Sequence, residues 1–333
     1  MTDDWTLLHA RIHQTLRQRS LLPRGQRLLL AISGGQDSLC LLRLLLDLQP
    51  KWDWHLAVGH CNHRWRLDAD ANAEYVNQLA TSYGLLCYIA IAPELPATEA
   101  AARDWRYQSL SQLASAQGYT HLVTGHTASD RAETLLHNLM RGSGADGLQA
   151  LTWQRHLNPE LALVRPLLEV TRAETAAFCQ QANLTIWEDS TNQNLAYTRN
   201  RIRQQLIPML QTYNPQVEHA LSQTAELLRA DVDYLEAAAY SLWQQVVQST
   251  EAEPDRFGLN RKILSNAPLA LQRRIMRRFL QESLSVAPNF EQIEKCLLLL
   301  KAANRSQSDP LPGGAIAQVK VDWLVLNRPL DCP

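Results

Sequence analysis

Short apolar runs alternate with longer stretches of helical periodicity over the first two thirds of the chain. The runs at residues 28–32, 55–60, 85–91 and 121–124 have the length and apolar character of buried strands. Between them, apolar side chains recur every three to four residues, as in helices that cover a core. This alternation predicts an α/β fold in which helices cover both faces of a parallel sheet.

The pattern changes in the last third of the chain. Residues 216–248 form one long helical pattern, and two shorter helical patterns follow it. After a Leu-Pro-Gly-Gly turn, residues 317–326 alternate as a strand. We therefore predict an α/β catalytic domain over residues 1–214 and a smaller, mainly helical domain over residues 215–333 that ends in a short β hairpin.

Composition excludes several classes of protein. With 46% hydrophobic and 20% charged residues and a net charge of −1, the chain has the make-up of an ordinary globular protein. None of its six cysteines forms a Cys-x-x-Cys pair, which argues against a zinc or iron–sulfur site. The acidic start lacks an apolar signal segment, and no apolar run approaches the ~20 residues of a membrane span. We expect a cytoplasmic protein without a membrane partner.

A polar, glycine-rich turn separates the first predicted strand from an apolar helix. It consists of Ser33, Gly34, Gly35, Gln36, Asp37 and Ser38. Adjacent glycines let an anion approach the backbone, and the N–H groups at a helix start favour negative charge. The Lys-Ser/Thr pair of the ordinary nucleotide P-loop is missing, and the carboxylate of Asp37 stands there instead. A carboxylate beside phosphates indicates a Mg²⁺ ion between them.

Two further polar segments follow predicted strands. His60 and Asn62 end the second strand, and His126 follows the fourth. Asp130 and Glu133 are three residues apart, so they share a helix face, where they either complement the helix dipole or bind a cation, Mg²⁺ or a substrate amine. Ligands of parallel sheets bind at the carboxyl ends of the strands. We therefore expect the turn and these two segments to form one site.

A basic segment lies near the end of the predicted catalytic domain. Arg199, Arg201 and Arg203 are separated by single residues and follow Asp189 and Asn192 closely in the chain. Runs of charge often form only a solvated surface. The spacing here favours a clamp for the phosphates of ATP or of a nucleic acid.

Together these motifs resemble those of the tRNA(Ile)-lysidine synthetase family within the PP-loop ATP pyrophosphatase superfamily. The matching segments are SGGQDS, HCNHRWR, EAAARDWRY, GHTASDRAET, LMRGSG, RPLLE and WEDSTNQNLAYTRNRIRQQLIP. The resemblance covers roughly residues 25–210. It implies an enzyme that uses ATP and Mg²⁺ to adenylate the C2 oxygen of the wobble cytidine in an isoleucine tRNA with a CAU anticodon. Free L-lysine then displaces AMP to give lysidine, which changes the tRNA from methionine to isoleucine specificity.

The resemblance also implies where ATP binds. Residues 33–38 would hold its pyrophosphate end, and His60 and Asn62 would contribute to the nucleotide site. Asp37 and Asp130 would hold Mg²⁺, which offsets the charge that develops on the phosphates.

Further roles follow from the same resemblance. The residues implied to act at the reacting centre are Asp37, His126, Asp130 and Glu133. Either Asp130 or Glu133 would meet the lysine amine. Arg103 or Arg106 would meet the lysine carboxylate or the tRNA. The arginines expected to contact phosphates of ATP or of the anticodon loop are Arg199, Arg201 and Arg203.

One position departs from the family pattern, which has two adjacent acids in Gly-His-x-x-Asp-Asp. Ser129 replaces the first acid, so either Asp130 alone carries the metal or amine contact, or activity is altered. The chain is also short for the family, which leaves the tRNA acceptor end to its last third. Basic residues there either contact that end or form a solvated helix face. They are Arg273, Arg274, Arg277 and Arg278.

Three alternatives remain open from the sequence. A cytidine thiolase would share the loop but needs paired cysteines. An amide-forming ATP pyrophosphatase would leave the basic segment around Arg201 without a role. A non-catalytic RNA-binding protein is disfavoured by the intact loop and favoured by Ser129. The sequence does not decide between a monomer and a homodimer.

Overall fold

The chain divides into two compact units, residues 1–229 and residues 230–333. The computed structural model describes residues 5–65, 67–95, 98–188, 194–250, 253–284 and 286–327. The boundary that we predict after residue 214 precedes helix α10 (Val217–Val246), and the division between the units falls within that helix. No helix in the described ranges is both long enough and apolar enough to cross a membrane.

The described residues of the first unit form a six-stranded sheet in the order β3-β2-β1-β4-β6-β5. The strands are β1 (Arg27–Ala31), β2 (His55–Asn62), β3 (Leu86–Ile91), β4 (His121–Thr124), β5 (Gln154–Asn158) and β6 (Leu161–Val164). Neighbouring strands pair in parallel except β5, which runs antiparallel to β6 at the edge. The parallel α/β fold is thus confirmed, although the sequence pattern did not predict the β5–β6 hairpin.

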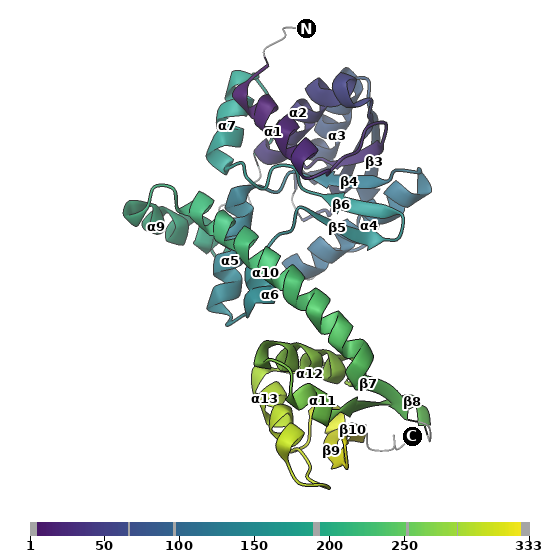
Figure 1. The fold of residues 1–333 in the computed structure, drawn as a ribbon. Helices are drawn as coiled ribbons and strands as arrows, with labels where there is room; N and C mark the ends of the chain where they lie inside the picture. Colours follow the sequence, from purple (N-terminus) through teal and green to yellow (C-terminus); the bar gives the residue numbers. More distant parts are fainter. Residues whose placement is uncertain are drawn as a thin grey trace. The chain divides into compact units, whose positions relative to one another are not determined.

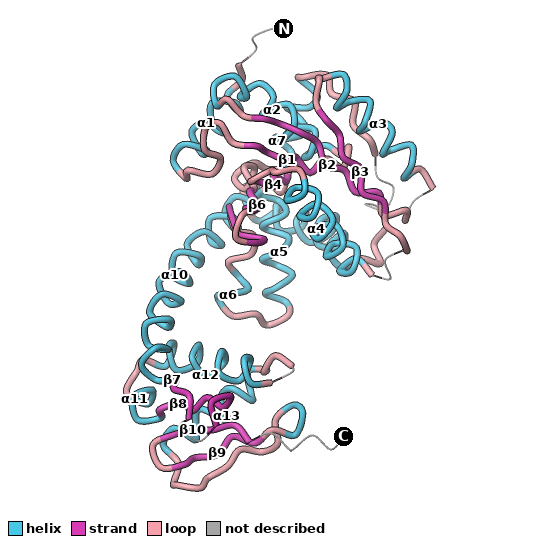
Figure 2. Tube along the Cα trace, turned by 90° about the vertical axis from the view of Figure 1, so that its right-hand side faces the viewer, coloured by secondary structure: helices cyan, strands magenta, loops and turns pink. Residues whose placement is uncertain are grey.

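Helices cover both faces of this sheet, as Figures 1 and 2 show. The helices that precede α10 in the described residues are α1 (Leu7–Gln18), α2 (Gln36–Trp52), α3 (Ala69–Ser82), α4 (Glu99–Ala116), α5 (Ala128–Met140), α6 (Ala145–Leu148), α7 (Arg172–Gln181), α8 (Thr198–Arg201) and α9 (Ile207–Tyr213). Leu28 and Leu30 of β1 join Phe178 of α7 in one core, whereas Leu29 joins Leu110 of α4 in another. Successive strand residues point to opposite faces, so β1 is buried on both.

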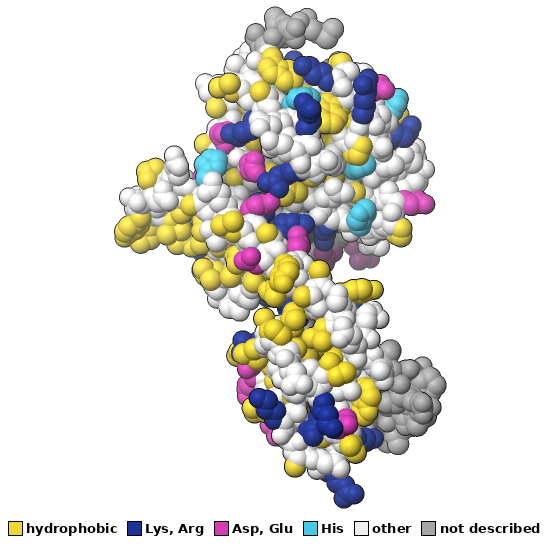
Figure 3. Space-filling model, viewed as in Figure 1, with side chains coloured by type: hydrophobic (Ala, Val, Ile, Leu, Met, Phe, Trp, Pro, Cys, Tyr) yellow, Lys and Arg dark blue, Asp and Glu magenta, His cyan; other side chains and the backbone are white. Residues whose placement is uncertain are grey.

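Near the end of the first unit, the chain continues from α8 through a π-helical turn, Ile202–Leu206, into α9. Ile202 and Ile207 pack with Ala132 of α5 in a small separate core, which seats the basic segment beside α5. Met209 and Tyr213 of α9 are exposed, and hydrophobic side chains gather over this helix in Figure 3.

The described residues of the second unit form a four-stranded sheet in the order β7-β8-β10-β9. The elements are β7 (Val247–Thr250), β8 (Glu253–Asn260), α11 (Arg261–Ser265), α12 (Leu269–Ser283), α13 (Phe290–Leu298), β9 (Ile316–Lys320) and β10 (Trp323–Asn327). The segment that the sequence predicts as one strand, residues 317–326, forms two strands, β9 and β10, which pair as an antiparallel hairpin. Because β10 also pairs with β8, β7 and β8 extend this hairpin into a sheet that the local pattern did not reveal.

The basic face of α12 is neutralised by acids of the same unit. The ion pairs are Arg273–Glu294, Arg274–Glu236, Arg277–Glu236 and Arg278–Glu282. These pairs tie the α12 arginines to acids of the same unit, and a contact with the tRNA stays a prediction.

Candidate active site

The glycine-rich loop lies at the carboxyl end of β1 and opens α2. Gly34 has φ +86°, and a Cβ there would come within 2.7 Å of Nδ2 of Asn72, so both conformation and space require glycine. Ser38 Oγ donates to the Gly35 carbonyl at 2.8 Å and accepts from the Ser33 N–H at 3.2 Å. Gly35 caps α2 without a side chain, so the first-turn N–H groups retain their capacity to bind an anion.

The loop after β4 lies directly against the start of α2. A Cβ on Gly125 would be 2.8 Å from the carbonyl oxygen of Asp37, a distance that real Cβ atoms do not adopt. Because only glycine fits here, the loop that carries His126 can approach the glycine-rich turn. Two of the three predicted polar segments are thereby brought to one place.

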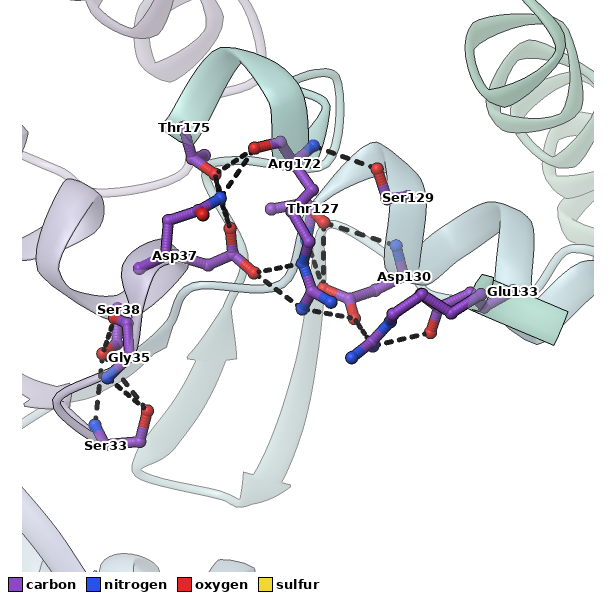
Figure 4. A network of polar contacts seen from close by, with 12 residues as sticks. Ser33, Gly35, Asp37, Ser38, Thr127, Ser129, Asp130, Glu133, Arg172 and Thr175 are labelled. Carbon is purple, nitrogen blue, oxygen red and sulfur yellow. Dashed lines mark hydrogen bonds and ion pairs between the residues drawn. The ribbon is translucent and has the colours of Figure 1, made fainter. Parts of the chain in front are cut away.

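Asp37 is held by side chains of α7. Arg172 Nε and Nη2 donate to Oδ2 of Asp37 at 3.0 and 2.8 Å, and Thr175 Oγ1 donates to Oδ1 at 2.5 Å (Figure 4). Gln36 Nε2 donates to the Arg172 carbonyl at 2.7 Å. The start of α7 is therefore tied to the start of α2 through both side-chain and main-chain groups.

Asp130 and Glu133 pair with the basic segment. Thr127 donates to Oδ2 of Asp130 through its N–H at 2.9 Å and its hydroxyl at 3.0 Å. Arg199 Nη2 donates to Oδ1 of Asp130 at 3.0 Å, and its Nε donates to Glu133 at 2.8 Å. Arg203 Nε and Nη2 donate to the two oxygens of Glu133 at 2.6 and 2.9 Å. These buried carboxylates are thus matched by guanidinium groups.

The predicted phosphate clamp accordingly contacts acids of the same chain. Arg199 and Arg203 pair with α5, while Arg201 is exposed and donates to Thr198 Oγ1 at 3.1 Å. A role of these arginines with phosphates stays a prediction. Asp189 and Asn192, which the sequence placed beside them, lie outside the described residues.

The arginines keep Asp130 ionised. Burial alone would raise the pKa of its carboxyl, but the nearby charges of Arg199 and Arg172 and the Thr127 N–H lower that pKa well below its usual range. Asp130 is therefore a carboxylate at neutral pH.

His126 is neutral at physiological pH. Burial, together with the charges of Arg165, Arg103 and Arg199, lowers the pKa of its imidazole to about 3, against the opposing effect of the nearby Asp130. Its Nδ1 lies 2.8 Å from Thr124 Oγ1. An imidazole of this kind acts as a hydrogen-bonding group and is too weakly basic to hold a proton at pH 7.

The other predicted nucleotide residues have partners within the chain. His60 Nδ1 lies 2.8 Å from the Ile32 carbonyl, and its side chain is buried in β2. Asn62 donates to Asp70 at 2.7 Å and accepts from the Arg64 N–H at 3.0 Å. These contacts shape the end of β2, and direct binding of ATP by either residue stays a prediction.

The predicted arginines of α4 differ in their surroundings. Arg103 donates to Tyr107 Oη at 3.4 Å, and its guanidinium lies 5.2 Å from the centre of that ring. It is near enough to His126 to lower the pKa of the imidazole. Arg106 is exposed on the same helix. Their contacts with lysine or tRNA stay predictions.

Three residues of this network were not singled out by the sequence as functional. Arg172 and Thr175 follow the helix-capping residue Thr171, whose side chain accepts from the Glu174 N–H. Ser129 was noted as a departure from the family, and its Oγ accepts from the Arg172 N–H at 3.0 Å. A hydroxyl at this position therefore anchors the first turn of α7 to α5.

Asp37 and Asp130 direct one oxygen each toward the same guanidinium. Nη2 of Arg172 lies 2.8 Å from Oδ2 of Asp37 and 3.9 Å from Oδ1 of Asp130. The described residues contain no group of three or more His, Cys, Asp or Glu side chains arranged around a metal. Mg²⁺ in nucleotide sites uses one or two carboxylates together with phosphate oxygens and water. This pair of carboxylates fits such a donor set, with Arg172 in the space between them.

The fold and the loop define the class of protein. Residues 6–210 match the family described as a PP-loop domain. A solved structure with the same fold is that of the U34-tRNA thiolase NcsA from Methanococcus maripaludis, with a TM-score of 0.57 and 16% identity over 66% of this chain and 77% of that one.

Curated relatives extend the likeness to nearly the whole chain. The tRNA(Ile)-lysidine synthase of a Nostoc species is 59% identical over 97% of this chain and 98% of its own. That of a Synechocystis species is 52% identical over 96% and 97%, respectively. The chloroplastic enzyme of Zygnema circumcarinatum is 33% identical over 99% and 87%. The chain therefore belongs to the tRNA(Ile)-lysidine synthase family, which confirms the resemblance seen in its motifs.

Proposed function

We propose that this enzyme joins free L-lysine to C2 of the wobble cytidine in tRNA(Ile) with a CAU anticodon, with ATP consumed to AMP and pyrophosphate. The observation that carries the proposal is the convergence of the glycine-rich loop with the acids of α5, which meet through Arg172. The glycine-rich turn and a buried cluster of paired carboxylates and guanidinium groups thereby lie side by side.

The first step is adenylation of the cytidine. The C2 carbonyl oxygen is a poor leaving group, and transfer of AMP from ATP onto it releases pyrophosphate and makes it a good one. Residues 33–38 hold the pyrophosphate end of ATP through backbone N–H groups at the start of α2. Mg²⁺ held by Asp37 and Asp130 supplies charge stabilisation for the phosphates when bound.

The second step is attack of the lysine ε-amine on C2, with AMP as leaving group. Asp130 and Glu133 offer carboxylate oxygens to the ammonium group of lysine, which loses a proton to solvent before its ε-amine attacks C2. If Nδ1 of His126 accepts from Thr124, Nε2 carries the hydrogen and donates to the reacting oxygen. Arg103 then binds either the carboxylate of lysine or the tRNA.

The decisive experiment combines purified protein, Mg²⁺-ATP, labelled lysine and unmodified CAU-anticodon tRNA. We expect label in the tRNA in equal amount to the AMP released. Formation of AMP only with sulfide or ammonia as acceptor would contradict the proposal and favour a thiolase or an amide-forming enzyme. Binding of tRNA without any AMP would favour the RNA-binding alternative.

A variant of the loop separates the two steps from tRNA binding. Asp37→Asn is expected to lower AMP formation at least about 1,000-fold, because the carboxylate nearest the phosphates loses its charge. Affinity for tRNA should change less than about twofold, since Asp37 lies at the nucleotide loop. The matched control is Asp47→Asn on the same helix, where Asp47 pairs with His9 and Arg43. Equal turnover of the two variants would remove Asp37 from the proposed site.

A further inference from the structure

Arg172 lies where a cation can face both Asp37 and Asp130. Its guanidinium makes two hydrogen bonds to Oδ2 of Asp37 and approaches Oδ1 of Asp130 to 3.9 Å. The other oxygen of each acid is held by neutral donors, Thr175 for Asp37 and Thr127 for Asp130. The two oxygens that face Arg172 are therefore bound only by guanidinium groups, since Oδ1 of Asp130 also accepts from Arg199 at 3.0 Å, while the neutral donors keep both carboxylates oriented.

The main chain and the side chain of Arg172 are held very differently. Its N–H donates to Ser129, and its carbonyl accepts from Gln36. Its side chain is 34% exposed, and its guanidinium contacts both acids. The guanidinium can therefore swing on its flexible stem while the first turn of α7 stays in place.

The charges of the cluster around Arg172 determine how its guanidinium responds when a metal ion binds. The cluster contains three carboxylates and three guanidinium groups, so its formal charge is zero. They are Asp37, Asp130, Glu133, Arg172, Arg199 and Arg203. A divalent cation between Asp37 and Asp130 would sit against the guanidinium of Arg172 and be repelled by it. The nucleotide phosphates bring the negative charge that can accept a displaced guanidinium as a bidentate partner.

We propose that Arg172 is a built-in counter-ion that occupies the metal position between Asp37 and Asp130 and moves to the phosphates when metal-bound ATP enters. This proposal deepens the proposed function and rests on it. Arg172 is thereby a positioning residue that keeps the two acids apart and correctly oriented before nucleotide binds. It also makes metal binding depend on nucleotide, because the metal alone must compete with a tethered cation.

The test uses Mn²⁺, which takes oxygen ligands as Mg²⁺ does, and electron paramagnetic resonance of the protein without nucleotide or tRNA. Wild-type protein is expected to bind Mn²⁺ weakly, and Arg172→Gln at least tenfold more tightly. Adding Asp37→Asn to Arg172→Gln should remove the increase in Mn²⁺ affinity. The control is Arg11→Gln, because Arg11 pairs with Glu174 of the same helix and lies outside the acid pair.

A second variant keeps the test independent of how well the glutamine variant folds. Arg172→Lys retains the charge but lacks the planar fork, so its Mn²⁺ affinity should fall between those of wild type and Arg172→Gln. Affinity within twofold of wild type for the folded Arg172 variants would overturn the proposal. This measurement of Mn²⁺ affinity needs no turnover. If the wild-type enzyme forms lysidine and the Arg172 variants bind Mn²⁺ no more tightly than wild type, only the present proposal is contradicted. A wild-type protein that forms no lysidine contradicts the proposed function instead.

Discussion

Arg131 of α5 and Glu226 of α10 form an ion pair of 2.6 Å behind the candidate active site. Arg131 is 1% exposed and lies between Asp130 and Glu133 in the sequence, on the opposite side of the helix from the acid cluster. Glu226 also accepts from Trp153 Nε1 at 2.9 Å and from Arg19 at 2.8 Å. The carboxylate of Glu226 thus holds α5 through Arg131, and α5 carries both Asp130 and Glu133.

Removing that carboxylate should destabilise the first unit. Glu226→Gln leaves the buried charge of Arg131 without its counter-ion, and we expect a loss of about 3 kcal/mol in the free energy of unfolding. Urea denaturation followed by circular dichroism measures it. The control is Glu169→Gln, which breaks an exposed pair with Arg19 and should cost less than about 1 kcal/mol. Equal losses in the two variants would show that the Arg131–Glu226 pair contributes no more to the free energy of unfolding than an exposed ion pair does.

Gly125→Ala should separate the two loops of the site. The added Cβ meets the main chain of Asp37, which cannot move aside as a flexible side chain would. We expect a loss of about 2 kcal/mol in stability and at least tenfold weaker ATP binding, measured by calorimetry. Gly144→Ala is the matched control, because a Cβ there meets nothing within 4 Å and the backbone has φ −73°. Unchanged ATP affinity in Gly125→Ala would contradict the close approach of the loops.

The pH dependence of stability should report the buried imidazole of His126. Its pKa is lowered to about 3 in the folded state, chiefly by burial, against an ordinary value of about 6.5. Between these values the unfolded chain takes up a proton that the folded chain does not, so stability falls as pH falls. From pH 6.5 to pH 5.0 the contribution of His126 is about 2 kcal/mol at most.

Comparison of variants isolates that contribution. His126→Asn should flatten the decrease in unfolding free energy between pH 6.5 and pH 5.0, measured by urea denaturation at each pH. His55→Asn serves as the control, since His55 is exposed at the start of β2. Identical slopes in wild type and His126→Asn would show that the imidazole titrates alike in both states.

Glu133→Gln should affect the lysine step more than adenylation. The change removes one negative charge from the acid cluster and weakens the pairing with Arg199 and Arg203. We expect KM for lysine to rise about tenfold or more, as for loss of a charge-assisted contact, with a smaller effect on pyrophosphate release from ATP and tRNA. Glu174→Gln is the control, since Glu174 pairs with Arg11 away from the cluster. An equal loss in both steps would place Glu133 in adenylation.

The local pattern predicted β1 to β4 because each is an apolar run followed by a helical period. It did not predict β6, because the apolar pattern of the four buried residues Leu161–Val164 is too short to distinguish a strand from a loop. Strands β7 and β8 were missed for a similar reason, because their membership in a sheet depends on pairing with β10. Sheet membership is a non-local property, and short strands carry little local signal of it.

The sequence by itself determined the glycine-rich loop, the alternation of the first four strands with helices, and the family. These features depend on residue type and spacing within short segments, such as Gly34 and Asp37 beside an apolar strand. Only the tertiary structure decided which cation faces which acid. Arg172 is 135 residues from Asp37, and Arg199 is 66 residues from Glu133. Such pairs form because the parallel sheet brings the starts of α2, α5 and α7 to one edge, and no local pattern encodes that meeting.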